Sequence, residues 1–111
     1  MNISRFKAII REREQIDDEW TEGVTKCHND LISVLCEDFE GTLEYLRTDC
    51  TAEEFSWISE VFDEIAIRTR NPEFINVLRA LAEKFPEETA EYNIIPFIDS
   101  AEYQLQQPDE Q

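Results

Sequence analysis

The side chains best suited to chemistry in this sequence are one histidine, three cysteines and 26 carboxylates. His28 follows Cys27 directly, but neighbouring side chains on a helix point about 100° apart, which does not suit a nucleophile and its base. There is no second histidine to form a metal pair, and no phosphate-binding loop, dinucleotide fingerprint or nucleophile elbow. The acidic runs at 17–19 and 37–38 lack the spacing of a calcium-binding loop. We therefore expect a protein that is not an enzyme and holds no cofactor or metal.

Carboxylates are concentrated in the middle of the chain. The formal net charge is −16, and residues 37–66 contain ten acidic side chains and a single arginine. Like charges four residues apart destabilise a helix by roughly a few tenths of a kcal/mol, and two such pairs occur here, Glu40–Glu44 and Glu60–Glu64. The pattern favours a surface kept anionic for a basic partner. The alternative is a solvated face whose carboxylates lie near helix N-termini.

Two aromatic side chains, Tyr45 and Trp57, fall among these carboxylates and off the predicted apolar stripes. Tyrosine and tryptophan are frequent anchors of protein interfaces. The alternative for Trp57 is that it packs beneath the first helix or a loop. The predicted partner-binding residues are Glu40, Glu44, Tyr45, Glu53, Trp57, Glu60, Asp63 and Glu64. A second acidic patch, at Glu87, Glu88, Glu91 and Tyr92, is the alternative location.

The composition predicts an all-α protein. Hydrophobic residues make up 41% of the chain, and only two glycines are available for the tight turns of β-hairpins. We expect about five to seven helices in a compact bundle or a short stack of antiparallel helical hairpins. A single domain is predicted at 1–105, followed by a frayed polar tail at 106–111.

The most strongly patterned segment is the helix predicted over residues 51–69. Thr51 and Glu54 have the spacing of a capping box, which satisfies backbone N–H groups at a helix start. Apolar residues then recur at three- and four-residue steps, at Phe55, Ile58, Val61, Phe62, Ile65 and Ala66. The opposite face would carry Trp57, Glu60 and Glu64 one above another.

Other helices are expected over about 2–20, 24–36, 39–47, 72–85 and 96–105. Gly23 either breaks the first helix or merely weakens a longer one. Asp38 and Asn71 are predicted N-caps. Pro86 ends a helix or opens a short turn of helix through Tyr92. Residues 94–98 resemble a strand, but Pro96 argues against it.

An odd number of cysteines without paired spacing suits free thiols in a reducing compartment: Cys27, Cys36 and Cys50. No apolar run has the length of a signal peptide or a membrane span, so we expect a cytoplasmic protein. Nucleic acid and membranes are anionic and are not expected as direct partners. The high like charge favours a monomer before the partner binds.

Two segments carry a resemblance to a known family. They are GTLEYLRTDCTAEEFSWISEVFDEIAIRTRNPEFINVLRALAEKFPEE at 41–88 and YNIIPFIDSAE at 92–102. They resemble helical immunity proteins of bacterial polymorphic-toxin systems, above all those paired with contact-dependent growth-inhibition toxins. The resemblance implies a cytoplasmic protein that binds the C-terminal toxin domain of a cell-surface effector and blocks its active site. Many of these toxins are nucleases with basic clefts.

The residue-level reasoning leads to a compatible hypothesis. Carboxylates can pair with the lysines and arginines that otherwise hold phosphates, so an acidic helical domain suits a plug for a nuclease cleft. We therefore predict an immunity protein that neutralises a cognate toxin domain, a basic nuclease, by occlusion. The main alternative is an acidic nucleic-acid mimic that regulates a basic host protein. A third hypothesis is a helical scaffold with a merely solvated acidic face.

Overall fold

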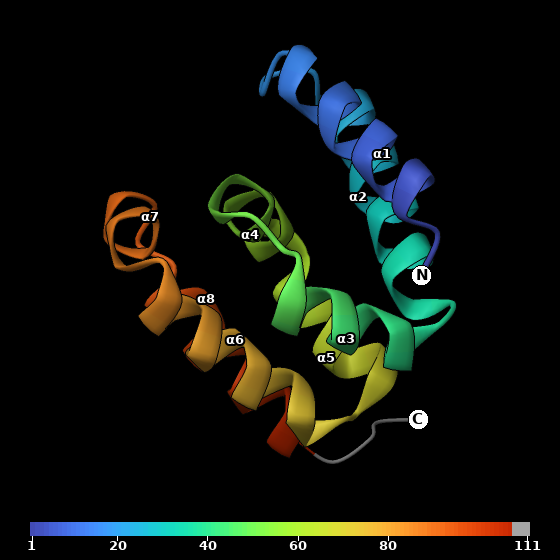
Figure 1. The fold of residues 1–111 in the computed structure, drawn as a ribbon. Coiled ribbons are helices and arrows are strands. Elements are labelled where there is room, and N and C mark those ends of the chain that lie inside the picture. The colour runs from blue at the N-terminus through green and yellow to red at the C-terminus, as the bar shows by residue number, and fades with distance from the viewer. Residues whose placement is uncertain (108–111) are drawn as a thin grey trace.

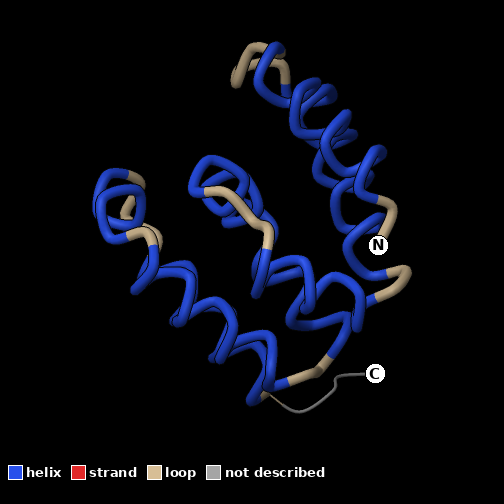
Figure 2. Tube along the Cα trace, viewed as in Figure 1, coloured by secondary structure: helices blue, strands red, loops and turns tan. Residues whose placement is uncertain are grey.

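Helices and short loops make up the whole of the described chain, residues 1–107 of a computed structural model (Figure 2). The elements are α1 (Ile3–Gln15), α2 (Thr21–Cys36), α3 (Phe39–Thr48), α4 (Ala52–Ile58), the 3₁₀ turn η1 (Ser59–Val61), α5 (Phe62–Thr69), α6 (Pro72–Lys84), α7 (Pro86–Glu91) and α8 (Ile95–Gln106). Because α4, η1 and α5 follow without a gap, they form one kinked segment, which makes seven helical segments in this range. The all-α prediction is confirmed, and no strand occurs between residues 1 and 107.

Antiparallel neighbours organise the fold (Figure 1). The α1–α2 hairpin stands on one side, and α6 and α8 pack against each other on the other side. The kinked segment and α3 lie between these two groups, and α5 packs against both α2 and α8. The molecule measures 36 × 34 × 26 Å, so it is a compact globule.

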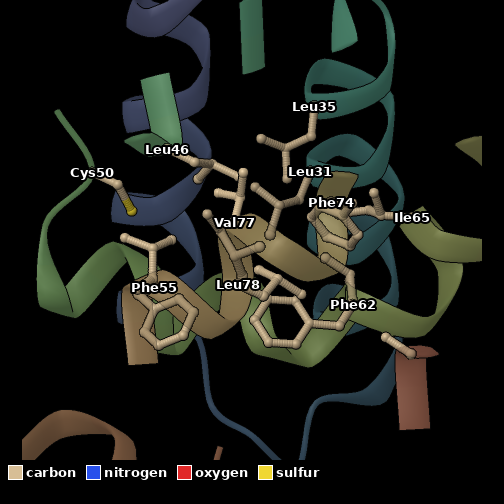
Figure 3. Packing of buried hydrophobic residues seen from close by; sticks show 14 of the residues in the cluster. Leu31, Leu35, Leu46, Cys50, Phe55, Phe62, Ile65, Phe74, Val77 and Leu78 are labelled. Atoms are coloured by element: carbon tan, nitrogen blue, oxygen red, sulfur yellow. The ribbon is translucent and has the colours of Figure 1, made fainter. Parts of the chain in front are cut away.

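The apolar stripe predicted on residues 51–69 lies at the centre of the core. Phe55 and Phe62 are fully buried, and their ring centroids lie 5.9 Å apart. Phe74 of α6 meets Phe62 edge-on at 6.0 Å, and Leu78 lies beside them (Figure 3). Such interlocking of large side chains from several helices explains why the short helices hold together.

The prediction of one continuous helix over 51–69 was wrong. The capping box of Thr51 and Glu54 starts α4 as predicted, but the helix tightens into η1 at Ser59. The Ser59 hydroxyl donates to the Ser56 carbonyl, a local bond that competes with regular helix geometry. Since a 3₁₀ helix has only three residues per turn, η1 shifts the register of α5 relative to α4. The predicted stack of three side chains on one straight face is therefore lost.

The first helix also ends earlier than predicted, at Gln15 instead of Trp20, and α2 begins at Thr21. Gly23 neither breaks a helix nor lies at an end of one; it is inside the first turn of α2. A Cβ on Gly23 would overlap the ring of Trp20, so glycine lets that ring cross the helix. A break between two helices, one of the two alternatives, is therefore present, but it lies at residues 16–20 rather than at Gly23.

The remaining boundaries are close to those predicted. The N-caps at Asp38 and Asn71 are confirmed, since each side chain accepts from a backbone N–H of its helix. Residues 94–98 lead into α8 rather than a strand, and α7 follows Pro86. The spacing of Ile3, Phe6 and Ile10 would place Ile3 on the apolar stripe of the first helix, but its side chain is exposed. Gln106 still belongs to α8, and the end of the predicted tail, 108–111, lies outside the described residues.

All three cysteines are free thiols, and two of them are buried. None of the helices described is long and apolar enough to cross a membrane.

Candidate functional site

The eight predicted partner-binding residues do not share one surface. Besides Glu60, four carboxylates are exposed: Glu40 and Glu44 on α3, Glu53 on α4 and Glu64 on α5. Asp63 is half-buried and accepts a hydrogen bond from the Ser100 hydroxyl at 2.9 Å, which ties α5 to α8. Within residues 1–107, none of these five carboxylates forms an ion pair.

Tyr45 was predicted as an exposed anchor, but it lies in the core with 5% of its surface exposed. Its ring meets Phe6 of α1 edge-on at 5.6 Å. The hydroxyl donates to Glu54 Oε1 at 2.7 Å, and Glu54 Oε2 accepts from Lys7 Nζ at 2.7 Å. The tyrosine faces inward because its ring contacts Phe6 of α1 and the buried carboxylate of Glu54 satisfies its hydroxyl.

This arrangement predicts a measurable sensitivity to alkali. Burial, together with the hydrogen bond to Glu54, raises the pKa of Tyr45 to about 12, against about 10 in an unfolded chain. The folded protein therefore keeps this proton longer, so the associated stability is complete below pH ~10 and is lost as pH rises towards ~12.

The change from pH 9 to pH 11 should lower the free energy of unfolding by about 1 kcal/mol more in the wild type than in Tyr45→Phe. Urea unfolding of both proteins at the two pH values measures this difference. Equal losses in the two proteins would contradict the assigned role of the hydroxyl.

A groove of about 350 Å³ gathers aromatic and acidic side chains at one end of the molecule. Its lining residues come from the C-terminal end of α1 and the loop after it, from α4 with η1, from α7 and the loop after it, and from the start of α8. Its walls are Arg13, Asp18, Glu53, Ser56, Trp57, Ser59, Glu60, Glu88, Tyr92 and Phe97. We call this the acidic–aromatic groove; it includes three of the eight predicted residues and two from the alternative patch.

Arg13 lines the groove and is buried, with 6% of its surface exposed. Its guanidinium donates two hydrogen bonds to Glu60, from Nε at 3.0 Å and from Nη2 at 2.9 Å. Nη1 donates to Asp18 at 2.9 Å, and the guanidinium lies 5.0 Å from the ring centroid of Trp57. Bidentate pairing and stacking together fix the half-buried Trp57 in place.

Glu60 is therefore engaged within the protein, contrary to its prediction as a free contact residue. Besides Arg13, its Oε1 lies 2.9 Å from His28 Nε2. Burial alone would raise the pKa of Glu60, but hydrogen bonds from His28 and Arg13 outweigh it and hold the pKa below its usual value. Glu60 thus joins α1, α2 and η1.

Elsewhere in the groove, Glu53 has no ion-pair partner within residues 1–107, and only a hydrogen bond with Trp57 acts to lower its pKa. A hydrogen bond with the carboxyl of Glu14, and repulsion from its charge, raise the pKa of Glu53; Glu88 adds a smaller repulsion. Glu91, Glu88 and Glu53 similarly raise the pKa of the Tyr92 phenol. Acidic side chains from three helices, α1, α4 and α7, therefore lie close enough to repel one another.

Two aromatic rings at the rim of the groove are open to solvent. Tyr92 is 52% exposed and Phe97 is 47% exposed. Large exposed rings beside a half-buried tryptophan are typical of surfaces that contact another protein.

Another hollow, of about 230 Å³ between α3 and α6, is a weaker candidate. Half of its lining residues are aliphatic, and two of its three charged side chains already pair, since Arg47 and Glu73 lie 2.8 Å apart. Among the side chains described, no three histidine, cysteine, aspartate or glutamate residues are grouped to hold a metal ion.

Several groove residues were not singled out from the sequence: Arg13, Asp18 and Phe97. A signal existed for Arg13, because it continues the stripe of Phe6, Ile9 and Ile10, and a cation on an apolar stripe indicates a buried ion pair. No local pattern marks Asp18 or Phe97, which reach the groove through the packing of distant segments.

Comparisons of the chain with protein-family models, curated proteins and solved structures found no match.

Proposed function

We propose that this protein is an immunity protein that binds a cognate bacterial toxin domain and neutralises it by occluding a basic active-site cleft. The observation that carries the proposal is the acidic–aromatic groove. There, Glu53 and Glu88 remain without a cation among residues 1–107, next to exposed Tyr92 and Phe97. The similarity of 41–88 and 92–102 to helical immunity proteins supports the same function.

A hydrogen bond with Glu14 and repulsion from Glu14 and Glu88 disfavour the charged form of Glu53 and so raise its pKa. Elsewhere some acids are paired, as with Arg79 between Asp99 and Glu102, while others, such as Glu40 and Glu44, are exposed without an ion pair. Acids kept unpaired beside exposed rings suit a surface whose cations are supplied by a partner. A nuclease that holds phosphates with lysine and arginine has such cations.

The second candidate is an acidic mimic of nucleic acid that binds basic host proteins. The observation in its favour is that Glu40 and Glu44 are exposed and lie outside the groove, so negative charge is not restricted to one site. A mimic would bind several basic proteins with moderate affinity.

A pulldown from lysate of the source cells distinguishes the two candidates. The protein serves as bait, with washes at about 50 and about 500 mM salt, because charge attraction between exposed groups is screened at the higher concentration. The immunity function predicts one basic fragment from the C-terminus of a large surface protein, retained at both concentrations. Many basic proteins lost together at high salt would favour the mimic. No retained partner at either concentration would contradict both.

A further inference from the structure

We infer that the acidic–aromatic groove receives an arginine side chain of the partner protein, held between Glu53 and Glu88 and stacked on an exposed ring of the groove. This inference rests on the proposed function and specifies the chemistry by which the partner would be recognised. It assigns the central contact to one groove rather than to the acidic surface as a whole.

The protein's own Arg13 shows how these walls hold a guanidinium. It stacks on Trp57 at 5.0 Å while Glu60 accepts two of its hydrogen bonds. Asp18 is the second carboxylate on Arg13, and the groove is also lined by another ring and two other carboxylates, those of Tyr92, Glu53 and Glu88. The rim differs in having no cation of its own, since none of the ion pairs within residues 1–107 involves Glu53 or Glu88.

The electrostatics of the rim favour a cation over any other ligand. Glu14 and Glu88 both act on Glu53 to disfavour its charged form, and an incoming positive charge would relieve that repulsion. An anionic or phosphate-bearing ligand would add to it. A neutral apolar side chain could contact Phe97 but would leave the carboxylates uncompensated.

Arginine fits the groove better than lysine does. Its planar group stacks on aromatic rings and pairs with carboxylates through several fixed donors, whereas lysine acts as a point charge. The groove offers both kinds of partner, in rings that are half exposed and carboxylates on two different helices. Its volume of about 350 Å³ is enough for a side chain rather than for a folded segment.

The test uses a capped peptide, acetyl-Gly-Arg-Gly-amide, titrated into the full-length ¹⁵N-labelled protein at low salt. Its neutral counterpart replaces arginine with citrulline, which has nearly the same shape. The indole N–H signal of Trp57 reports on the groove, and Trp20→Phe assigns it, because the chain has only two tryptophans. We expect saturable shifts at Trp57 and Tyr92 with the arginine peptide, and at least about tenfold weaker binding of the citrulline peptide.

Matched variants locate the site. Glu53→Gln combined with Glu88→Gln should weaken arginine binding at least about tenfold, whereas Glu40→Gln combined with Glu44→Gln, with the same change in charge, should alter it less than about twofold. Equal binding of both peptides, equal weakening in both double variants, or no saturable shift would overturn the inference. The titration needs no toxin, so its failure is distinct from a failure of neutralisation.

Discussion

Replacing Glu53 and Glu88 together by lysine is expected to lower the affinity for the basic partner by at least about 10³-fold while leaving the fold intact. Each substitution would place a cation against the partner's arginine, and losing one close charge pair in an interface already removes about 2–5 kcal/mol. Both side chains lie on helix surfaces and take no part in the core. A lysine at 53 would also neutralise its repulsion with Glu14.

The measurement is isothermal titration calorimetry with the captured partner, combined with thermal unfolding of each variant alone. The matched control is Glu40→Lys with Glu44→Lys, which changes the net charge equally but lies outside the groove. We expect the control to slow association at low salt and to change the affinity at about 150 mM salt less than tenfold. Similar losses in both double variants would show that only total charge matters.

Arg13→Ala is expected to lower the free energy of unfolding by about 2–3 kcal/mol. The substitution leaves Glu60 without its bidentate partner and removes the group that stacks on Trp57. The expected loss is below that of a fully buried pair because Glu60 keeps 31% of its side chain exposed and His28 remains beside it. Trp57 should become more mobile and its fluorescence should shift to the red.

Two variants serve as controls in urea unfolding. Arg11→Ala removes an exposed arginine from the same helix and should change stability by less than about 0.5 kcal/mol. Asp18→Asn removes a partner of Arg13 that is itself 82% exposed, so a loss of at most about 1 kcal/mol is expected. If Arg13→Ala were as mild as Arg11→Ala, the guanidinium would not support the groove.

Local sequence signals predicted most of the fold. The capping box at Thr51, the N-caps at Asp38 and Asn71, and the apolar periodicity of α6 each depend on residues within one or two helical turns. Such signals act through hydrogen bonds and side-chain spacing that need no knowledge of the tertiary structure.

The errors occurred where another helix decides the outcome. Tyr45 lies off the stripe of Leu43 and Leu46, yet α1 packs over it and Glu54 satisfies its hydroxyl. A helical wheel assigns residues to faces but does not show which faces another helix will cover.

For the same reason, the sequence predicted only part of the candidate site. Glu53 and Trp57 were chosen from charge and amphipathicity, and both line the groove. Glu60 was chosen by the same reasoning, but a cation 47 residues away in the sequence pairs with it. The two acidic patches treated as alternatives contribute to one groove, since α7 brings Glu88 and Tyr92 beside α4.

The most direct test of the proposed function is rescue of growth from a captured toxin domain. The C-terminal domain identified by pulldown is expressed from an inducible promoter in a heterologous bacterium, with or without this protein. The proposal predicts that the wild type restores growth, the groove variant Glu53→Lys with Glu88→Lys fails, and Glu40→Lys with Glu44→Lys still protects. Protection should not extend to a toxin of another class. Failure of the wild type to restore growth, at an expression level that binds all of the toxin, would contradict an immunity function.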